Sequence, residues 1–505
     1  MNANLFALLA SRFPQNPDAD ALLIPDGPTL SYGWLDAQTA RYAGLLKKIG
    51  VEPGARVCVQ IEKSPQNLVL YLACLRAGAV YLPLNTAYTP SEVAYFLGDA
   101  TPRLLVCDPG KLEALRPIAQ EAGVVHVLTL GSDGTGDLSE QANVCAPDPW
   151  IYDAKPDDLA AILYTSGTTG RSKGAMLSHA NLASNALALH QIWGWRPGDV
   201  LIHALPIFHV HGLFVAVHCA LLNGSAMWFL PKFDAQTVLG LMDRATVIMG
   251  VPTFYTRLLA LKNLNRESTA AMRLFISGSA PLLAETSDAF AERTGRRILE
   301  RYGMTEAGMI ASNPLDGDRI PATVGYPLPD VAARITDDRG APLKAGEIGV
   351  LEIKGPNVFK GYWKMPEKTA AEFRPDGFFI TGDMATIADD GRISIVGRAK
   401  DLIISGGFNV YPKEVEQAID AIPGVIESAV IGLAHPDFGE AVAAVIVADG
   451  SAPLDEPSVL AALKDHLARF KQPKAVFFVE ELPRNAMGKV QKGQLRQCYE
   501  ATFQA

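Results

Sequence analysis

The chain has 505 residues, 49% of them hydrophobic and 20% charged, so it is long enough for more than one domain and ordinary in composition for a globular protein. Its net charge of −9 and the lack of any long basic run argue against nucleic acid as a partner. The sequence contains no run of about 20 apolar residues, so it predicts no membrane span. Six scattered cysteines without a C-x-x-C pair predict a reducing cytoplasm and argue against a disulfide framework or a zinc knuckle.

Residues 1–156 alternate between patterns typical of helices and of buried strands. Apolar runs at 56–61 and 104–107 predict strands, and residues 66–76 predict a helix that ends at Gly78. Such alternation is typical of parallel α/β layers, so we expect an α/β fold here. The N-terminus is apolar but lacks a basic leader, so we expect no signal peptide.

The segment 164–174 reads Tyr-Thr-Ser-Gly-Thr-Thr-Gly-Arg-Ser-Lys-Gly. It follows an apolar run at 159–164, a predicted buried strand, and precedes Ser178, the predicted N-cap of a helix. Glycines let backbone N–H groups close around an anion, hydroxyls add donors, and Arg171 or Lys173 adds charge. The segment therefore predicts a polyphosphate cradle, with a plain glycine- and threonine-rich turn as the alternative.

Two common nucleotide motifs are absent from the chain. The loop of ordinary ATPases and GTPases needs a second glycine, followed by lysine, after four intervening residues, but here Ser172 follows Gly167 after four residues. No G-x-G-x-x-G occurs either. The segment instead resembles the phosphate-binding loop of the adenylate-forming superfamily, which includes acyl-CoA synthetases, luciferases and peptide-synthetase adenylation domains. The resemblance implies that the nucleotide contacts Thr165, Ser166, Gly167, Thr168, Thr169, Gly170 and Lys173.

Residues 201–214 carry two histidines close together. His209 and His211 could share one face of a strand, as metal ligands often do, but no cysteine accompanies them and the nearest carboxylate is distant. A metal site is therefore the weaker interpretation. The segment resembles the acyl-pocket motif of the superfamily, which implies that His209 lies beside the substrate carboxylate.

Three further motifs follow in the superfamily's order. Residues 250–259 and 274–282 each pair an apolar run with a turn that opens a helix, and Arg301-Tyr-Gly-Met-Thr-Glu306 follows a short predicted strand. Any one of them alone could be a helix-capping turn. The resemblance implies that Thr305 meets the AMP phosphate and that Glu306 and Thr165 hold Mg²⁺ together with the phosphates. The implied nucleotide pocket comprises Gly278, Ser279, Ala280, Pro281, Arg301, Tyr302, Gly303, Met304 and Thr305.

Short alternating strands, broken by Gly, Pro and Asp, are predicted over residues 347–396. Asp383 could accept hydrogen bonds from two vicinal ribose hydroxyls, because a carboxylate only accepts. The motif 397–401 resembles the superfamily's domain hinge, with Arg398 at a second ribose contact and Lys400 at the pivot. We therefore expect an N-terminal ATP- and acyl-binding domain over 1–398 and a mobile C-terminal domain over 399–505.

The C-terminal part reads as a compact α+β unit, with helices at 411–422 and 458–470. The resemblance implies that Gly406 and Gly407 lie beside the pantetheine tunnel of coenzyme A. It also implies that Lys489 swings over the acyl carboxylate and the α-phosphate. Asn485 departs from the family pattern, which has Thr or Ser there.

The implied activity is that of an ATP-dependent acid–CoA ligase that uses Mg²⁺, ATP and coenzyme A. A carboxylate must first be activated, and Lys489, the phosphate loop and Mg²⁺ would supply the positive charge for that step. A non-catalytic nucleotide-binding module would be expected to lack Lys489 and Glu306. A peptide-synthetase adenylation domain is the nearest rival, but we expect no carrier domain after Ala505. An acetyltransferase acting on Lys489 is a further candidate partner.

The acid itself is predicted from residues 208–214 and 251–257, which resemble malonyl- and methylmalonyl-CoA synthetases. A helix capped by Thr253 would place Phe254, Arg257, Leu258 and Leu261 on one face. Arg257 on that apolar face could hold the second carboxylate of a diacid. A short- or medium-chain monocarboxylate is the alternative substrate. The predicted acid-binding residues are His209, Val210, Arg257, Ser279 and Met309.

Overall fold

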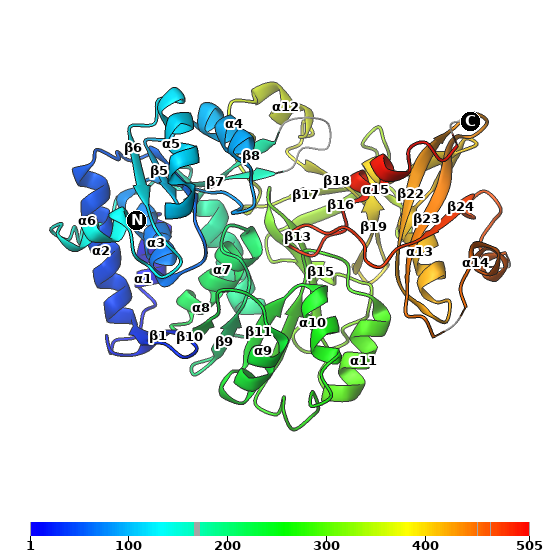
Figure 1. The fold of residues 1–505 in the computed structure, drawn as a ribbon, viewed down its shortest axis with the longest axis horizontal. Coiled ribbons are helices and arrows are strands. Elements are labelled where there is room, and N and C mark those ends of the chain that lie inside the picture. The colour runs from blue at the N-terminus through cyan, green and yellow to red at the C-terminus, as the bar shows by residue number, and fades with distance from the viewer. Residues whose placement is uncertain (1, 166–171, 452, 465, 504–505) are drawn as a thin grey trace. The chain divides into compact units, whose positions relative to one another are not determined.

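The computed structural model describes residues 2–165, 172–451, 453–464 and 466–503 (Figure 1). The chain divides into two compact units. The first comprises Met1–Pro321, Gly325–Ala332 and Lys354–Phe379, and the second comprises Ala322–Val324, Ala333–Ile353 and Ile380–Ala505. The expected α/β fold with a small C-terminal α+β part is confirmed. The boundary at 398/399 stays a prediction.

One sheet of the first unit has six strands in the order β6-β5-β3-β4-β7-β8. They are β3 (Arg56–Gln60), β4 (Val80–Pro83), β5 (Leu104–Cys107), β6 (His126–Thr129), β7 (Leu159–Thr165) and β8 (Lys173–Ser178). The first five are parallel to their neighbours, whereas β8 runs antiparallel to β7. Their apolar runs are buried because helices cover a parallel sheet.

The other sheet of this unit has nine strands in the order β15-β14-β13-β12-β11-β9-β10-β1-β2. They are β1 (Asp20–Leu23), β2 (Thr29–Ser31), β9 (Val200–His203), β10 (Ala226–Phe229), β11 (Val247–Gly250), β12 (Leu274–Ser277), β13 (Leu299–Met304), β14 (Gly308–Ser312) and β15 (Tyr326–Pro327). The central run from β13 to β1 is parallel. The carboxyl ends of these strands therefore lie along one edge of the sheet.

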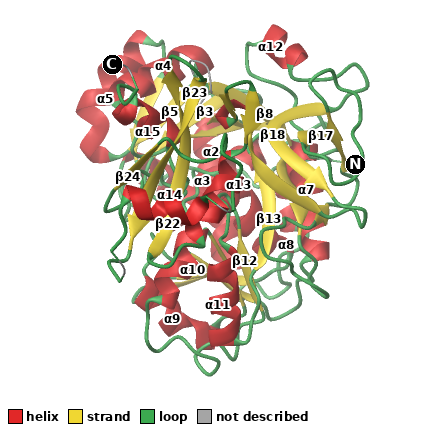
Figure 2. Cartoon of the chain, turned by 90° about the vertical axis from the view of Figure 1, so that its right-hand side faces the viewer, coloured by secondary structure: helices red, strands yellow, loops and turns green. Residues whose placement is uncertain are grey.

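Helices connect the strands of the first unit, and several begin with the expected caps. Ser178 accepts a hydrogen bond from the Asn181 N–H as the N-cap of α7, and α3 ends at Gly78 with φ of 76°. Figures 1 and 2 show α9, α10 and α11 grouped beside β11 and β12. The helices are α1 (Leu5–Ala10), α2 (Tyr32–Lys48), α3 (Pro65–Ala77), α4 (Pro90–Ala100), η1 (Pro109–Lys111), α5 (Leu112–Glu121), α6 (Asp137–Asn143), α7 (His179–Ile192), η2 (His211–Val217), α8 (His218–Leu222), α9 (Ala235–Leu241), η3 (Met242–Arg244), α10 (Pro252–Leu259), α11 (Ala284–Thr294) and α12 (Pro366–Ala371).

The second unit is built on two small sheets, with strand orders β16-β17-β18-β19 and β21-β20-β23-β22, and β24 pairs with β23. Its strands are β16 (Ala332–Thr336), β17 (Gly349–Lys354), β18 (Phe379–Ile387), β19 (Ile393–Arg398), β20 (Ile403–Ser405), β21 (Phe408–Val410), β22 (Val425–His435), β23 (Gly439–Ala448) and β24 (Ala475–Phe478). Its helices are η4 (Ala399–Asp401), α13 (Pro412–Asp420), α14 (Glu456–Leu463) and α15 (Lys492–Tyr499).

Three expectations about local structure were wrong. The helix predicted over 458–470 ends at Leu463, because the Gln472 side chain donates to the carbonyls of Lys464 and Leu467 and supports turns there. The motif from Arg301 to Met304 forms β13 itself instead of following it. A separate finding, not one of these three, is that no helix among the described residues is long and apolar enough to cross a membrane.

The third expectation that was wrong concerns the paired histidines. His209 lies in a bend beyond β9, and His211 begins η2, a π-helical segment. The two side chains therefore do not share a strand face.

Candidate active site

The predicted phosphate loop connects two antiparallel strands, β7 and β8. Thr165 and Lys173 are register partners at the ends of these strands. The Thr165 hydroxyl also donates to the Lys173 carbonyl at 3.4 Å. The strand pairing thus brings both ends of the loop together. The loop residues predicted to bind nucleotide between these ends, Ser166, Gly167, Thr168, Thr169 and Gly170, lie outside the described residues.

Lys173 takes part in a polar network inside the first unit. Its ammonium group lies 3.0 Å from Glu372 Oε1 and 4.2 Å from the centre of the Tyr362 ring. The Tyr362 hydroxyl lies 2.6 Å from Glu372 Oε2 and 3.1 Å from Glu306 Oε1, so it can donate to either carboxylate. Burial and the two carboxylates raise the pKa of Tyr362. Tyr362 therefore links the loop lysine Lys173 to Glu306.

Thr165 and Glu306 fit the role of Mg²⁺ ligands in their chemistry. Both offer oxygen atoms, and the Glu306 side chain is buried. In the described ranges, no cluster of three or more His, Cys, Asp or Glu could hold a metal by itself. Mg²⁺ often takes only one or two carboxylates and completes its shell with phosphate oxygens and water. These residues therefore suit a Mg²⁺ ion that arrives with a nucleotide.

The predicted nucleotide pocket lies at the carboxyl edge of the nine-stranded sheet. Parallel β12 and β13 pair Ser277 with Glu300, so residues 278–281 leave the end of β12 beside residues 301–304, which continue β13 beyond that pair. Ser279 has a φ of 72°, and its hydroxyl lies 3.2 Å from His211 Nδ1. The sequence motifs predicted for this pocket are therefore neighbours in space.

Arg301 is the most deeply buried cation in this region. It is 2% exposed, and its Nε and Nη2 atoms have no hydrogen-bond partner among the described residues. Burial lowers its pKa to about 9, and nearby Tyr255 opposes this shift. A Cβ atom on Gly278 would lie 2.4 Å from Arg301 Cζ, so only glycine leaves room for the guanidinium. A buried cation with unused donors is a ready partner for an anion.

Most of the predicted acid-binding residues lie in loops and helices after the neighbouring parallel strands, whereas Met309 lies on antiparallel β14. Val210 and Met309 are buried, His209 is half-buried, and the His209 ring accepts from the His211 N–H at 3.3 Å. Arg257 lies on α10, and its side chain is exposed.

The predicted capping of α10 was wrong. Pro252 is the first helical residue and Val251 is the N-cap, so Thr253 lies inside the helix. The helix ends at Leu259, which places Leu261 beyond it. Phe254 and Leu258 are buried, whereas Arg257 is exposed, so the arginine does not share their burial.

Several predicted residues meet within the second unit. Asp383 and Arg398 are register partners on β18 and β19, and Arg398 Nε lies 2.6 Å from Asp383 Oδ1. The Lys489 side chain keeps solvent exposure, yet protein atoms around its ammonium group and the charges of Arg398 and Lys400 lower its pKa. Lys400 lies in η4, directly after Arg398. Asp383, Arg398, Lys400 and Lys489 thus form one charged cluster.

The loop that carries Lys489 is closed by Asn485. The Asn485 amide oxygen accepts hydrogen bonds from the Met487 and Lys489 N–H groups, each at 3.0 Å. The Asn485 and Lys489 backbones also pair at 3.0 Å. Asn485 therefore fulfils the turn-closing role that a hydroxyl side chain could serve. Gly406 and Gly407 form the turn between β20 and β21, with φ of 58° and 82°.

Residues 9–363 match the AMP-binding enzyme family, and residues 414–489 match its C-terminal domain. The chain belongs to the AMP-binding enzyme family. Its relatives include a malonate–CoA ligase of Arabidopsis thaliana, 35% identical over 94% of this chain and 85% of that protein. A feruloyl-CoA synthase of an Amycolatopsis species is 36% identical over 94% of each chain. ATP-bound MatB from Rhodopseudomonas palustris is 57% identical over 100% of both chains, with a TM-score of 0.97.

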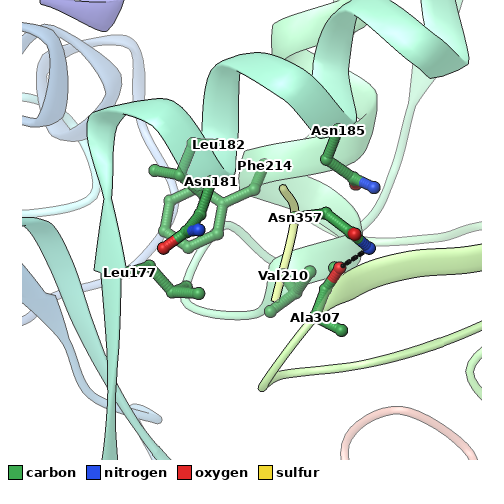
Figure 3. Close-up of a pocket in the computed structure, with 9 residues that line it drawn as sticks. Leu177, Asn181, Leu182, Asn185, Val210, Phe214, Ala307 and Asn357 are labelled. Atoms are coloured by element: carbon green, nitrogen blue, oxygen red, sulfur yellow. Dashed lines mark hydrogen bonds between the residues drawn. The ribbon is translucent and has the colours of Figure 1, made fainter. Parts of the chain in front are cut away.

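This AMP-binding enzyme also has a small cavity lined in part by Val210, one of the predicted acid-binding residues. Figure 3 shows Asn357, whose side chain donates to the Ala307 carbonyl at 2.8 Å. The cavity wall includes Val210, Phe214 and Gly308 together with Leu177, Asn181, Leu182 and Asn185. Val210, which was predicted to border the acid, therefore also borders this cavity.

Sequence reasoning missed Tyr362 and Glu372 in this AMP-binding enzyme. The Tyr362 hydroxyl reaches Glu306 across 56 positions of the chain, and Lys173 reaches Glu372 across 199. No local pattern marks either residue, because their partners come from distant segments. The nearest signal is the Gly361-Tyr362 pair, since Gly361 has a φ of 114° and turns the chain back toward β8.

Proposed function

We propose that this AMP-binding enzyme is an ATP-dependent acid–CoA ligase that forms malonyl-CoA and methylmalonyl-CoA from the diacids and releases AMP and pyrophosphate. The similarity to a malonate–CoA ligase supports the choice of acid and of thiol. This similarity carries the proposal, and the structure adds Arg301, a buried guanidinium with unused donors at the edge where the predicted acid pocket lies.

The chemistry explains why the enzyme needs ATP first and a thiol second. A carboxylate is a poor electrophile, because its departing oxygen would leave as oxide. Attack of a carboxylate oxygen on the α-phosphorus of ATP expels pyrophosphate and makes an acyl-adenylate. Attack of the CoA thiolate on that anhydride expels AMP and makes the thioester. Both steps use the same carboxyl group of the acid, with ATP as its first partner and the thiol as its second.

The first step brings two anions together, so positive charge governs it. We assign Lys489 to the α-phosphate and the acid carboxylate, Lys173 to the outer phosphates, and Thr305 to the AMP phosphate. Thr165 and Glu306 would hold Mg²⁺, which supplies neutralising charge on the phosphate oxygens when bound. Asp383 accepts from the ribose hydroxyls, with Arg398 as the second ribose contact. His209 lies beside the reacting carboxylate.

The second carboxylate of the diacid requires a cation of its own, because an unpaired charge in a pocket costs several kcal/mol. We assign it to Arg257, whose planar fork matches a carboxylate. Arg301 is a second candidate, since its donors are unused and its neighbour Tyr255 belongs to the same helix as Arg257. Val210 and Met309 border the α-carbon.

The second step is assigned to a different pose of the C-terminal domain. We propose that Lys400 is the pivot between the domains 1–398 and 399–505, and that Gly406 and Gly407 border the pantetheine tunnel. Such a swing removes Lys489 after adenylation and admits the thiol. We also propose a cytoplasmic location and an acetyltransferase that acts on Lys489.

A panel of acids tests the proposed function directly. Pyrophosphate release would be measured with ATP, Mg²⁺ and CoA for malonate, methylmalonate, succinate, acetate, propionate and butyrate. We expect the highest kcat/KM for malonate or methylmalonate, with CoA-dependent turnover and a thioester product identified by mass. A higher kcat/KM for butyrate or propionate would assign the enzyme to short-chain monocarboxylates instead. Adenylation without thioester formation would favour a different acceptor.

A further inference from the structure

Lys63 is a buried lysine that lies between β3 and α3. Its ammonium nitrogen lies 2.6 Å from His203 Nδ1, 2.8 Å from the His203 carbonyl oxygen and 3.1 Å from the Leu205 carbonyl oxygen. The face of the Phe229 ring lies 4.2 Å from it. No carboxylate hydrogen-bonds to it in the part of the chain that the structure describes. All of these neighbours are uncharged acceptors.

The positions of the protons on Lys63 and His203 follow from the hydrogen-bond partners of these two side chains. His203 Nε2 lies 2.9 Å from the Gly212 carbonyl oxygen, which can only accept, so we assign the proton to Nε2. His203 Nδ1 then accepts from Lys63. Burial lowers the pKa of Lys63, but only an ammonium group has a hydrogen for each of three acceptors. Burial and the charge of Lys63 also lower the pKa of His203, which agrees with a neutral ring.

These contacts hold both ends of one short segment. His203 ends β9 and Leu205 lies two residues on, so Lys63 fixes the start of residues 204–211. The His203 ring fixes the other end through Gly212, at the first turn of η2. The chain folds tightly between them, because a Cβ atom on Gly212 would lie 2.0 Å from the Pro206 oxygen.

We propose that Lys63, acting with His203, is a positioning residue that sets the acid pocket by clamping residues 204–211. This segment carries His209 and Val210, which the proposed function places beside the acid, and the inference rests on that function. Lys63 touches neither acid nor nucleotide. Its removal should therefore loosen the acid-binding segment and leave the phosphate loop and its lysine Lys173 as they are.

The main variant is Lys63→Met, which keeps the aliphatic stem and removes all three hydrogen bonds. Arg319→Met is the matched control, because Arg319 also makes three hydrogen bonds in the same unit, in its case to the backbone carbonyls of Arg297, Pro314 and Leu315. His203→Gln is a milder second variant, because its amide can still donate to the Gly212 carbonyl while only the ring contact with Lys63 is lost and the backbone carbonyl of residue 203 still accepts from Lys63. It provides the test if Lys63→Met fails to fold.

Two readouts follow, with thermal unfolding as the check on stability. In the first, the KM for the best acid should rise by about 10-fold or more in Lys63→Met, because small displacements of a pocket are costly, while the KM for ATP stays within about twofold. In the second, hydrogen exchange of residues 204–212 should accelerate in Lys63→Met but not in Arg319→Met.

The outcomes separate this inference from the proposed function. Equal increases of the KM for acid and for ATP, or unchanged exchange at 204–212, would overturn the positioning role. If the wild-type enzyme does not activate malonate, the proposed substrate fails. The KM comparison then uses the acid that the wild type prefers, and the exchange measurement needs no substrate at all.

Discussion

Two cations of the proposed site, Arg301 and Lys489, differ in their surroundings. Arg301 is buried at the edge of the nine-stranded sheet and has unused donors. Protein neighbours, and not water, therefore fix the position of its side chain. Lys489 stands on a loop closed by its own Asn485 and keeps solvent exposure. A fixed buried cation suits recognition of a substrate charge, whereas a lysine on an exposed loop suits a group that acts in one step and leaves.

Lys489→Ala should abolish acyl-adenylate formation and spare thioester formation from supplied acyl-adenylate. Loss of one preorganised charged contact costs roughly 10²–10³ in rate. The measurement is pyrophosphate exchange for the first step and thioester formation from synthetic acyl-adenylate for the second. Equal losses in both steps would contradict the role assigned to Lys489. Acetylation of Lys489 removes the same charge, so fully acetylated enzyme should show the same pattern.

Arg257→Ala should lower kcat/KM for malonate by a factor equivalent to roughly 1.5–3 kcal/mol of transition-state free energy, because the second carboxylate loses a hydrogen-bonded charged partner. Butyrate should be unaffected or improve. Arg301→Met, assayed in parallel, tells which cation carries the larger share. If malonate and butyrate fall by the same factor in both variants, neither arginine recognises the diacid.

At the scale of elements, four parallel strands decide where the chemistry lies. β9, β11, β12 and β13 all end at one edge, so their following segments converge there although they are far apart in the sequence. The motif from Arg301 to Met304 is a strand because β14 returns beside it after a tight turn. A Cβ atom on Gly303 would lie 2.2 Å from the Gly308 oxygen, so the close pairing of β13 with β14 needs glycine at position 303.

Tyr362→Phe should raise the Mg²⁺ concentration that gives half-maximal adenylation by about tenfold, because groups that orient a metal ligand affect binding on that scale. The phenol bridges Glu306 and Glu372, and the variant leaves both carboxylates without it. Tyr42→Phe is the control, since its hydroxyl contacts Ser139 at 2.9 Å, remote in sequence from the site. The same Mg²⁺ dependence in Tyr362→Phe and in wild type would argue against the bridge.

Lys400→Pro should block the thioester step and spare adenylation. Proline fixes φ near −65° and removes the N–H, so a residue that must change its dihedral angles between two poses would be locked. Both half-reactions would be assayed separately, with Lys400→Ala as the control for loss of the side chain. Normal overall turnover in Lys400→Pro would exclude Lys400 as the pivot.

At the scale of the whole molecule, the chain divides into two units with separate cores. The core of the second unit packs α13 and α14 against β22 and β23. Asp420, at the end of α13, receives a hydrogen bond from Ser428 on β22 at 2.6 Å. Burial raises the pKa of Asp420 to about 6. The stability of this unit should therefore depend on pH through Asp420.

The sign of that dependence follows from proton binding. The folded state binds more protons than the unfolded state between about pH 4 and pH 6, so stability should fall as pH rises through this window. Asp420→Asn should remove the fall and gain about 1–3 kcal/mol at pH 7 relative to wild type. Denaturant unfolding at pH 4 and pH 7 measures this change in the free energy of unfolding, and Asp437→Asn, at an exposed position, is the control. If the free energy of unfolding differed by the same amount between Asp420→Asn and wild type at both pH values, the pH-dependent role of Asp420 would be refuted.

Sequence alone determined the parts of this protein whose cause is local. Apolar runs predict β3, β5 and β7 because buried parallel strands need them, and Ser178 and Gly78 predict helix ends because caps act within one turn. The order of the glycine-rich motifs was enough to indicate the family, since backbone approach to a nucleotide requires glycine at particular places.

Only the tertiary structure decided which distant residues meet and which side chains lose contact with water. Lys63 and His203 are 140 positions apart. Lys63 follows β3 of the six-stranded sheet and His203 ends β9 of the nine-stranded sheet, so only the packing of the two sheets brings them into contact. The burial of Arg301 and the exposure of Arg257 depend on how α10 packs on β11 and β12, where a 3.6-residue period alone misplaced the arginine. Local patterns specify elements, whereas burial and charge pairing depend on neighbours that only the folded chain supplies.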